Sequence, residues 1–307
     1  MKAIFLGTPD FAVKPLLRLF GMQDKIEIVA VITNPDRPVG RKQILTACPV
    51  KTKALELGLK VYSYDKIRLE GVEDVKSLNP DIMITCAFGQ ILSQELIDLP
   101  KYGVLNIHAS LLPKYRGASP IHYAILNGEE YSGVSIMKTE LGIDTGDVLL
   151  QEQIKIGDQE TCGELFERLS DLGADCIQKA IELICAGKAE FTKQDETKAT
   201  LTKMIKKEHA QIDWTDSAKN VFNKIRAFNP APVAYTFYKG EMLKIYTAQV
   251  SEGKGKPGEV LQNENTLEIA CGDGSIIITK LQRAGGKPMN TTDYLRGNKP
   301  DKGSILG

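Results

Sequence analysis

The sequence has few of the residues that bind metals. Its 307 residues include three histidines, and its six cysteines are widely scattered without a Cys-x-x-Cys pair. No histidine is placed to complete a zinc site with these cysteines. We therefore expect reduced thiols and a protein without a metal centre, which leaves metal-assisted hydrolysis without ligands.

Long hydrophobic runs are also missing. The apolar segment at 26–32, interrupted by Glu27, is far shorter than the roughly 20 residues that a membrane-spanning helix needs. The apolar start at 3–6 is ended by Gly7 and Pro9 before it could serve as the hydrophobic region of a secretion signal. We expect a cytoplasmic protein without a membrane partner.

The chain as a whole has no excess of either charge, because Lys and Arg equal Asp and Glu at 39 each. From residue 206 onward there are 15 Lys and Arg against 11 Asp and Glu, an excess of four positive charges. The preceding residues carry the opposite excess. This asymmetry is compatible with a polyanion at the C-terminal part, although an ordinary solvated lysine surface would give the same count.

The first half alternates short apolar segments with helical patterns. The expected buried strands are residues 2–7, 26–33, 81–86 and 103–108, and the expected helices between them are 10–20 and 50–58. This order predicts an α/β fold with a Rossmann-like, doubly wound, mostly parallel sheet. A long helix is expected from Glu160 to Cys185, and Gly187 ends it.

The second half begins where the apolar periodicity stops. The length of the chain favours two domains, and we expect a catalytic domain at 1–189, an exposed linker at 190–207 and a C-terminal domain at 208–307. The C-terminal domain is expected to contain one helix and five short strands: 216–227, then 233–238, 243–250, 259–261, 266–271 and 275–281. A hairpin turn is expected at 272–274. This pattern predicts a small antiparallel β-barrel of the oligonucleotide-binding (OB) type.

Two polar residues stand at the end of the expected strand 103–108. Because side chains alternate along a strand, Asn106 and His108 share one face, opposite Leu105 and Ile107. In open α/β sheets, ligands bind at the C-terminal ends of the strands. The pair is therefore a candidate site, and the alternative is a buried pair that hydrogen-bonds to the backbone.

A second candidate is Asp144, which lies between Gly142 and Gly146 in a loop after an apparent strand that ends at Lys138. Glycines give loops near ligands their backbone freedom. Asp144 could orient His108 or pair with its charge. The alternative is an ordinary turn stabilised by the Asp side chain.

The turn at residues 7–10 follows the first strand, where nucleotide-binding folds hold phosphates. Its spacing matches neither Gly-x-Gly-x-x-Gly nor the phosphate-binding P-loop, so neither a dinucleotide nor a nucleoside triphosphate is implied. We interpret Thr8 as a helix cap and Pro9 as the first helical residue.

The candidate residues belong to two longer motifs. Residues 106–121 read NIHASLLPKYRGASPI, and residues 142–147 read GIDTGD. Together they resemble the folate-dependent formyltransferase superfamily. Three further stretches, 7–12, 34–42 and 225–232, are similar to the methionyl-tRNA formyltransferase family. The resemblance covers nearly the whole length.

The resemblance implies transfer of the formyl group of 10-formyltetrahydrofolate to the α-amine of initiator methionyl-tRNA, in support of translation initiation. It implies a monomer without a metal, in which Asn106, His108 and Asp144 are catalytic. The folate-binding residues that it implies are Ser110, Leu111, Leu112 and Pro113.

The loop 34–42 resembles the segment of the family that enters the acceptor end of the tRNA. The cations that it offers for phosphate contacts are Arg37, Arg41 and Lys42. A mobile surface loop is the alternative. The sequence departs from the family pattern at Gln43 and Ile44, where more basic and small residues are usual, and at Ala231 and Val233, where Trp and Gly are usual. These changes concern domain packing or tRNA contacts rather than the reaction.

Two other functions fit parts of the sequence. A formyltransferase acting on a sugar-linked amine would have the same three catalytic residues and a comparable C-terminal part, and only the acceptor would differ. A non-catalytic nucleic-acid-binding protein with this fold would explain the basic second half, but not the presence of Asn106, His108 and Asp144 together.

Overall fold

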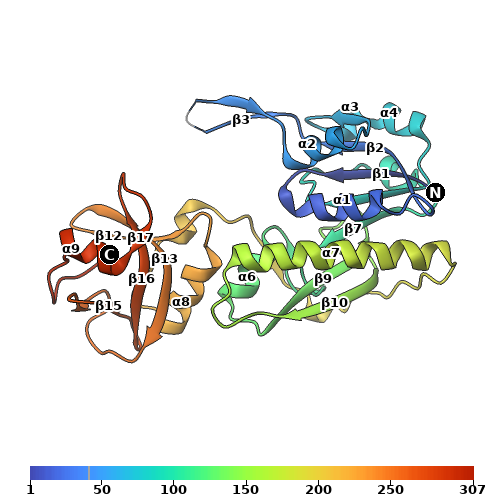
Figure 1. Ribbon diagram of the computed structural model, residues 1–307. Helices are drawn as coiled ribbons and strands as arrows, with labels where there is room; N and C mark the ends of the chain where they lie inside the picture. The colour runs from blue at the N-terminus through green and yellow to red at the C-terminus, as the bar shows by residue number, and fades with distance from the viewer. Residues whose placement is uncertain (41) are drawn as a thin grey trace. The chain divides into compact units, whose positions relative to one another are not determined.

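The computed structural model describes residues 1–40 and 42–307 and contains two compact units. The first unit consists of residues 1–117, 132–154 and 166–202, and the second of residues 118–131, 155–165 and 203–307. Each unit is thus assembled from several separate stretches of the chain (Figure 1). The contiguous domain limits expected near residues 189 and 208 stay a prediction.

The first unit is built on a seven-stranded sheet with the order β10-β9-β7-β6-β1-β2-β5. Its strands are β1 (Lys2–Gly7), β2 (Glu27–Thr33), β5 (Val61–Ser63), β6 (Ile82–Cys86), β7 (Val104–His108), β9 (Tyr131–Lys138) and β10 (Val148–Lys155). Neighbouring strands from β5 to β7 are parallel, and β9 pairs antiparallel with β7. The predicted Rossmann-like, mostly parallel sheet is confirmed.

The order of the strands reverses at β1. The chain runs from β1 to β2 and β5 on one side, then returns to add β6 and β7 on the other. The fully buried core of β1, which includes Ile4, Phe5 and Leu6, holds this centre of the sheet. In folds of this kind the reversal opens a crevice at the C-terminal ends of the central strands, which is where ligands bind.

The helices of the first unit are α1 (Val13–Phe20), α2 (Pro49–Glu56), α3 (Ile67–Glu70), α4 (Val72–Leu78), α5 (Gln94–Asp98) and most of α7 (Cys162–Cys185). Figure 1 shows α1 and α7 side by side over the strands. The Phe11 and Phe166 rings meet edge to face at 5.2 Å. Gly173 of α7 faces Ile107 of β7, where a Cβ would lie 3.2 Å from the Ile107 methyl group. The long helix therefore covers the strand that carries the candidate residues.

The start of the first helix differs from the expectation. A short 3₁₀ turn, η1 (Asp10–Ala12), precedes α1. The Thr8 hydroxyl is buried and has no hydrogen-bond partner among the residues that the structure describes. The prediction that Thr8 caps the helix is therefore wrong.

Two pairs of very short strands were not expected. β3 (Arg37–Val39) pairs antiparallel with β4 (Ile44–Thr46), within and just after the expected tRNA loop. β8 (Arg116–Gly117) pairs parallel with β11 (Leu201–Thr202). Strands of two or three residues are too short to show an alternating pattern in a sequence.

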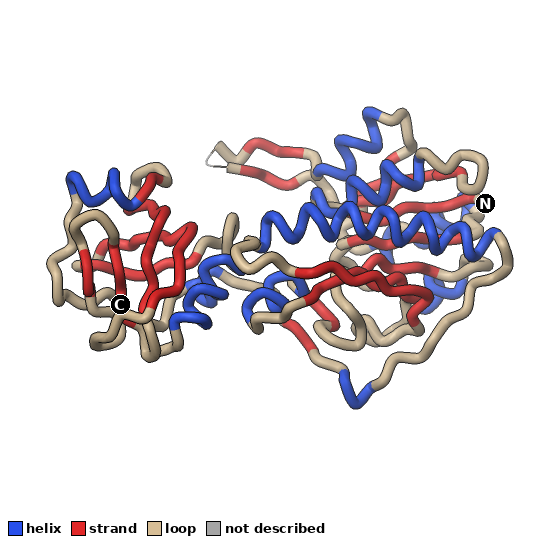
Figure 2. Tube along the Cα trace, turned by 60° about the horizontal axis from the view of Figure 1, so that its bottom comes forward, coloured by secondary structure: helices blue, strands red, loops and turns tan. Residues whose placement is uncertain are grey.

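The second unit contains an antiparallel sheet with the order β12-β13-β16-β15-β14, and β17 pairs with β16. Its elements are α6 (Pro120–Leu126), η3 (Lys207–Ala210), α8 (Ala218–Ala227), β12 (Ala234–Tyr238), β13 (Glu241–Ser251), β14 (Val260–Gln262), β15 (Leu267–Ala270), β16 (Ser275–Arg283), β17 (Met289–Asn290) and α9 (Thr291–Gly297). Figure 2 shows these strands in red around the C-terminus. Trp214 lies in the core and donates from Nε1 to the Thr236 hydroxyl at 2.9 Å. The five expected strands and the hairpin turn between β15 and β16 are confirmed.

Within the residues that the structure describes, every helix is too short or too polar to span a bilayer.

Candidate active site

Strand β7 places Asn106 and His108 at the C-terminal end of the sheet. Leu105 and Ile107, which alternate with them along the strand, are buried. Asn106 is half-buried, and His108 is 7% exposed. Both side chains thus leave a rigid, well-packed strand rather than a loop.

The loop after β9 brings Asp144 to this pair. Asp144 Oδ1 accepts a hydrogen bond from Asn106 Nδ2 at 3.3 Å. Asp144 Oδ2 lies 3.5 Å from His108 Nδ1 and accepts from the Gly117 backbone N–H at 2.7 Å. The structure therefore gathers Asn106, His108 and Asp144, called the trio below, into one cluster.

Asp144 has a left-handed backbone with φ of +51°. Asp tolerates this conformation better than most residues, but it still costs on the order of 1 kcal/mol. The loop around Asp144 must therefore be held in place by its contacts, because its own backbone preference does not favour the arrangement.

The second nitrogen of His108 fixes how the ring is protonated. Nε2 lies 3.0 Å from the Tyr115 carbonyl oxygen, which can only accept, so Nε2 carries a hydrogen. In the neutral ring, Nδ1 then bears the lone pair and faces Asp144. Nδ1 is therefore the ring atom that can accept a hydrogen bond or a proton, and it lies 3.5 Å from Asp144 Oδ2.

Thr85 on β6 orients the amide of Asn106. The Thr85 hydroxyl donates to Asn106 Oδ1 at 3.0 Å, and the two residues are register partners in the parallel pair. With its oxygen held there, the amide turns its NH₂ group toward Asp144. The sequence analysis did not predict a role for Thr85. Its position near the end of the expected strand 81–86 could have indicated that it lies close to Asn106.

The expected folate-binding segment follows β7 directly and is held by hydrogen bonds. The Ser110 hydroxyl donates to Lys114 O at 2.7 Å, and the Leu112 N–H donates to the Ser135 hydroxyl at 3.1 Å. Gln151 Nε2 donates to Leu112 O at 2.8 Å. Ser110 and Leu112 are buried, while Leu111 and Pro113 are half-buried. Their role in folate binding stays a prediction.

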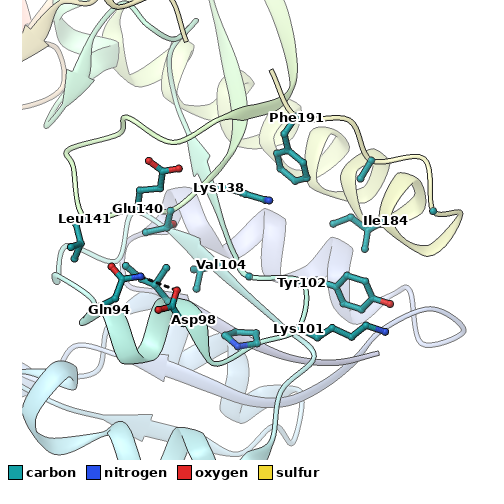
Figure 3. Close-up of a pocket in the computed structure, with 16 residues that line it drawn as sticks. Gln94, Asp98, Lys101, Tyr102, Val104, Lys138, Glu140, Leu141, Ile184 and Phe191 are labelled. Atoms are coloured by element: carbon teal, nitrogen blue, oxygen red, sulfur yellow. Dashed lines mark hydrogen bonds between the residues drawn. The ribbon is translucent and has the colours of Figure 1, made fainter. Parts of the chain in front are cut away.

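A cavity of about 940 Å³ lies beside the loop that carries Asp144 (Figure 3). Its walls come from α5 and the turn after it, the first residue of β7, the end of β9 with the start of the following loop, and the segment around the end of α7. The lining residues include Gln94, Val104, Lys138, Thr139 and Leu141. The Thr139 hydroxyl is buried without a hydrogen-bond partner among the described residues, so a polar group of a ligand could satisfy it.

Aromatic and charged side chains form the outer wall of this cavity. Lys138 Nζ lies 4.3 Å from the centre of the Phe191 ring, and Lys101 Nζ lies 4.9 Å from the Tyr102 ring. Figure 3 labels these four side chains among the residues that line the cavity. Over the described part of the chain, no group of three or more His, Cys, Asp and Glu could hold a metal ion. Apolar, aromatic and polar side chains together line this cavity, a mixture that is typical of sites for organic ligands.

Two of the three cations of the expected tRNA loop, Arg37 and Lys42, lie on the hairpin of β3 and β4. Arg37 is exposed and forms an ion pair with Asp65 at 2.8 Å. Lys42 is exposed, and Arg41 lies outside the described residues. Apolar side chains are also exposed on this hairpin, with Ile44 61% and Leu45 67% accessible. The structure keeps this segment accessible to a partner, and its contacts with tRNA stay a prediction.

Comparison with known families gives matches over almost the whole chain. The family described as formyl transferase matches residues 1–181, and the family described as formyl transferase, C-terminal domain, matches residues 204–299. Methionyl-tRNA formyltransferase from Alkaliphilus metalliredigens is 45% identical over 311 residues, covering 100% of this chain and 98% of that protein. The same enzyme from Bacillus mycoides is 44% identical over 313 residues, covering 100% and 99%.

Solved structures share the fold. An N-formyltransferase from Helicobacter canadensis, in complex with folinic acid and dTDP-3-aminofucose, has a TM-score of 0.69 at 24% identity and covers 91% of this chain and 98% of its own. Methionyl-tRNA formyltransferase from Clostridium thermocellum has a TM-score of 0.59 at 20% identity, covering 83% and 95%. Sequence identity of 42–45% over the full length of eight relatives is much more specific than these similarities of fold. The chain belongs to the methionyl-tRNA formyltransferase family.

Proposed function

We propose that this protein transfers the formyl group of 10-formyltetrahydrofolate to the α-amine of initiator methionyl-tRNA, and that the trio acts on the reacting atoms. The observation that carries the proposal is the meeting of Asn106, His108 and Asp144 at the C-terminal end of β7. Full-length identity to methionyl-tRNA formyltransferases supports the choice of substrates.

The reaction forms one carbon–nitrogen bond and breaks another. The α-amine attacks the formyl carbon, and the carbonyl oxygen becomes an oxyanion in the tetrahedral intermediate. The Asn106 NH₂ group is a preorganised donor for that oxyanion, held on a strand with its own oxygen fixed by Thr85. When the intermediate collapses, the bond from the carbon to N10 breaks and N10 leaves with a proton.

The trio can also carry the proton that the reaction moves. The attacking amine loses a proton, and N10 gains one, so the net change is a transfer between the two nitrogens. His108 Nδ1 can accept the amine proton, and the Asp144 carboxylate 3.5 Å away stabilises the charged ring. Asp144 can then support delivery of the proton to N10.

The substrates fit the surroundings of the trio. We propose that the flat ring of the folate enters the cavity of about 940 Å³, one wall of which is the start of the loop that carries Asp144. The remainder of the co-substrate would pass the trio and reach Ser110, Leu111, Leu112 and Pro113. The cations of the β3–β4 hairpin and the excess positive charge beyond residue 205 supply contacts for tRNA phosphates. We further propose that the protein acts as a monomer in the cytoplasm, where translation begins.

The proposal predicts that Asn106→Ala and His108→Ala each reduce turnover by at least about 100-fold, because removing one oxyanion donor or one positioned base costs that much. Turnover is measured as formylation of charged initiator tRNA with 10-formyltetrahydrofolate. Asn220→Ala, on the exposed side of α8, is the matched control and should keep full activity. Normal activity of Asn106→Ala or His108→Ala would reject the assignment.

A sugar-linked amine is the second candidate acceptor, because the N-formyltransferase from Helicobacter canadensis that was solved in complex with folinic acid and dTDP-3-aminofucose shares this fold. Parallel assays with charged initiator tRNA and with an amino-sugar nucleotide separate the two. Formyl transfer to the sugar alone would overturn our choice. Salt-sensitive tRNA binding without consumption of the formyl donor would instead indicate a binding protein.

A further inference from the structure

The backbone of Asp144 is held by a side chain 50 residues later in the chain. Gln194 Nε2 donates one hydrogen to Asp144 O at 2.8 Å and the other to Gly146 O at 2.7 Å. Both hydrogens of the Gln194 side-chain amide therefore bind carbonyl oxygens, one on each side of residue 145. A Gln side chain placed in this way fixes the position and the tilt of the peptide units that present the Asp144 carboxylate.

Gln194 is itself fixed by a buried cation. Its Oε1 accepts from Arg116 Nε at 3.0 Å and from Arg116 Nη2 at 2.9 Å. The far side of the guanidinium binds both oxygens of Glu196, at 2.7 and 2.8 Å. Arg116 is 4% exposed, and its hydrogen bond with Glu196 raises the pKa of Arg116 and lowers the pKa of Glu196. Arg116, Gln194 and Glu196 thus form one continuous network, called the clamp below.

The clamp is anchored on the same strip of backbone that touches the trio. β11 pairs with β8, the Tyr115 N–H donates to the Thr200 hydroxyl at 2.7 Å, and the Thr202 hydroxyl donates to Arg116 O at 2.9 Å. Along this strip, Tyr115 O accepts from His108 and the Gly117 N–H donates to Asp144. Residues 194–202 are largely exposed, as expected of a connector, yet these contacts tie them to the site.

The Asp144 loop needs such an anchor. Residues 141–143 are exposed, and Asp144 has the left-handed backbone described above. Among the elements that the structure describes, no helix or strand includes residues 139–147. Arg116 holds the Gln194 amide in place, and the hydrogen bonds from this amide restrain the loop as the hydrogen bonds of a strand would.

We propose that Gln194, supported by Arg116 and Glu196, is the positioning residue that sets Asp144 against His108 and Asn106. The inference rests on the proposed function in one respect, namely that Asp144 acts at the reacting atoms. Gln194 itself acts through the backbone of the loop and does not touch the substrates.

The first test compares Gln194→Ala with Gln194→Glu in the full-length protein. Glutamate has the same shape and still accepts from Arg116, but it has no hydrogens for the Asp144 and Gly146 carbonyls. Both variants should lower kcat by about 10- to 100-fold, because a shift of about 1 Å in a catalytic group can cost about 100-fold. The KM for tRNA should stay within a few-fold. Gln178→Ala, a surface glutamine of α7 that hydrogen-bonds Arg18 and Glu182, is the matched control.

Two further readouts distinguish positioning from general stability. Amide hydrogen exchange of residues 142–147 should speed up in both Gln194 variants and not in Gln178→Ala. The dependence of kcat on pH should also change in both Gln194 variants, because the distance between Asp144 and His108 is no longer fixed. If Gln194→Glu has the kcat and the amide hydrogen exchange of the wild type, the inference is overturned. Gln194 would then serve only to accept hydrogen bonds from Arg116.

Asp144→Ala separates this inference from the proposed function. If Asp144→Ala keeps wild-type turnover, the catalytic role of Asp144 fails, and the positioning role fails with it. If Asp144→Ala is inactive while both Gln194 variants are fully active, the proposed function stands and only the positioning role is rejected. Loss of activity in all three variants, with normal unfolding temperature in Gln194→Glu, supports both.

Discussion

At the scale of single residues, Asn106 and His108 are each oriented by a group outside the trio. Thr85 holds the amide oxygen of Asn106, and the Tyr115 carbonyl holds Nε2 of His108. These contacts decide which atom of each side chain faces Asp144. The alternating strand pattern could predict that Asn106 and His108 share a face, but the partners that set their orientation come from other segments.

Val233 is a residue-scale departure from its family that the structure explains in physical terms. It has φ of +70°, a left-handed conformation that a β-branched side chain rarely adopts, and its side chain is 4% exposed. Relief of the backbone strain is worth about 1–3 kcal/mol. Loss of a buried Val side chain costs about 1.5–2 kcal/mol. The two effects nearly cancel.

We therefore expect Val233→Gly to change the free energy of unfolding by less than about 1 kcal/mol, since the strain removed offsets the burial lost. Val260→Gly is the matched control, because Val260 is fully buried in β14 and has no left-handed backbone. It should cost about 3 kcal/mol, the sum of lost burial and the added flexibility of glycine. Chemical denaturation measures both. Equal losses in the two variants would contradict the strain at Val233.

At the scale of elements, the sequence predicts a helix or strand more accurately when its apolar pattern is longer. Strands β1, β2, β6 and β7 and helix α7 fall within two residues of their expected limits. The strands stand out as short apolar runs, and the helix repeats its apolar period several times. The pairs β3–β4 and β8–β11 have no such repeat. The clamp could not be predicted from the sequence either, because a contact between a side chain and a backbone carbonyl 50 residues away leaves no local sequence pattern.

Helix α7 begins with a reciprocal cap that predicts a pH effect. The Thr161 hydroxyl accepts from the Glu164 N–H at 3.3 Å, and Glu164 Oε2 accepts from the Thr161 N–H at 2.8 Å. The hydrogen bond from the Thr161 backbone lowers the pKa of Glu164 from its ordinary value of 4.5. A carboxyl group with a lowered pKa in the folded state adds stability above its unfolded pKa. That stability is lost as the pH falls through the lower folded pKa.

Thr161→Ala should lower the free energy of unfolding at neutral pH by about 1 kcal/mol, the usual value of such a cap. Glu164→Gln should destabilise the protein at neutral pH, and its difference from the wild type should shrink as the pH falls below 4.5. Glu252→Gln, at an exposed position, serves as the control. A difference that grows on acidification would show that the sign of the pKa shift is wrong. Denaturant titrations at several pH values measure these differences.

At the scale of the whole molecule, the six cysteines report how the chain is packed. All six are free; Cys185 is exposed, Cys48 is half-buried, and the other four are buried. Burial raises the pKa of Cys162, Cys176 and Cys271 to about 12 and raises that of Cys86 as well. Since the thiolate is the reactive form, a raised pKa and burial both slow reaction.

We expect a thiol-specific disulfide reagent to modify Cys185 rapidly and Cys48 more slowly, because the reagent can reach an exposed thiol more easily than a half-buried one. It should spare the four buried cysteines, whose thiols are inaccessible and have a raised pKa. Unfolding in guanidinium should expose all six. Cys185→Ser is the control that removes the fast phase. Rapid modification of Cys86 in the folded protein would show that the core of the first unit is open.

The first compact unit includes residues 166–202, and Gln194 reaches back to Asp144 from that stretch. During synthesis on the ribosome, Asn106, His108 and Asp144 all leave the exit tunnel before Gln194, Glu196 and β11 have been made. A nascent chain that has reached only residue 189 therefore contains the three proposed catalytic residues but not Gln194, which we propose positions Asp144. Activity should be acquired late in translation, when the segment up to residue 202 emerges and closes over the loop.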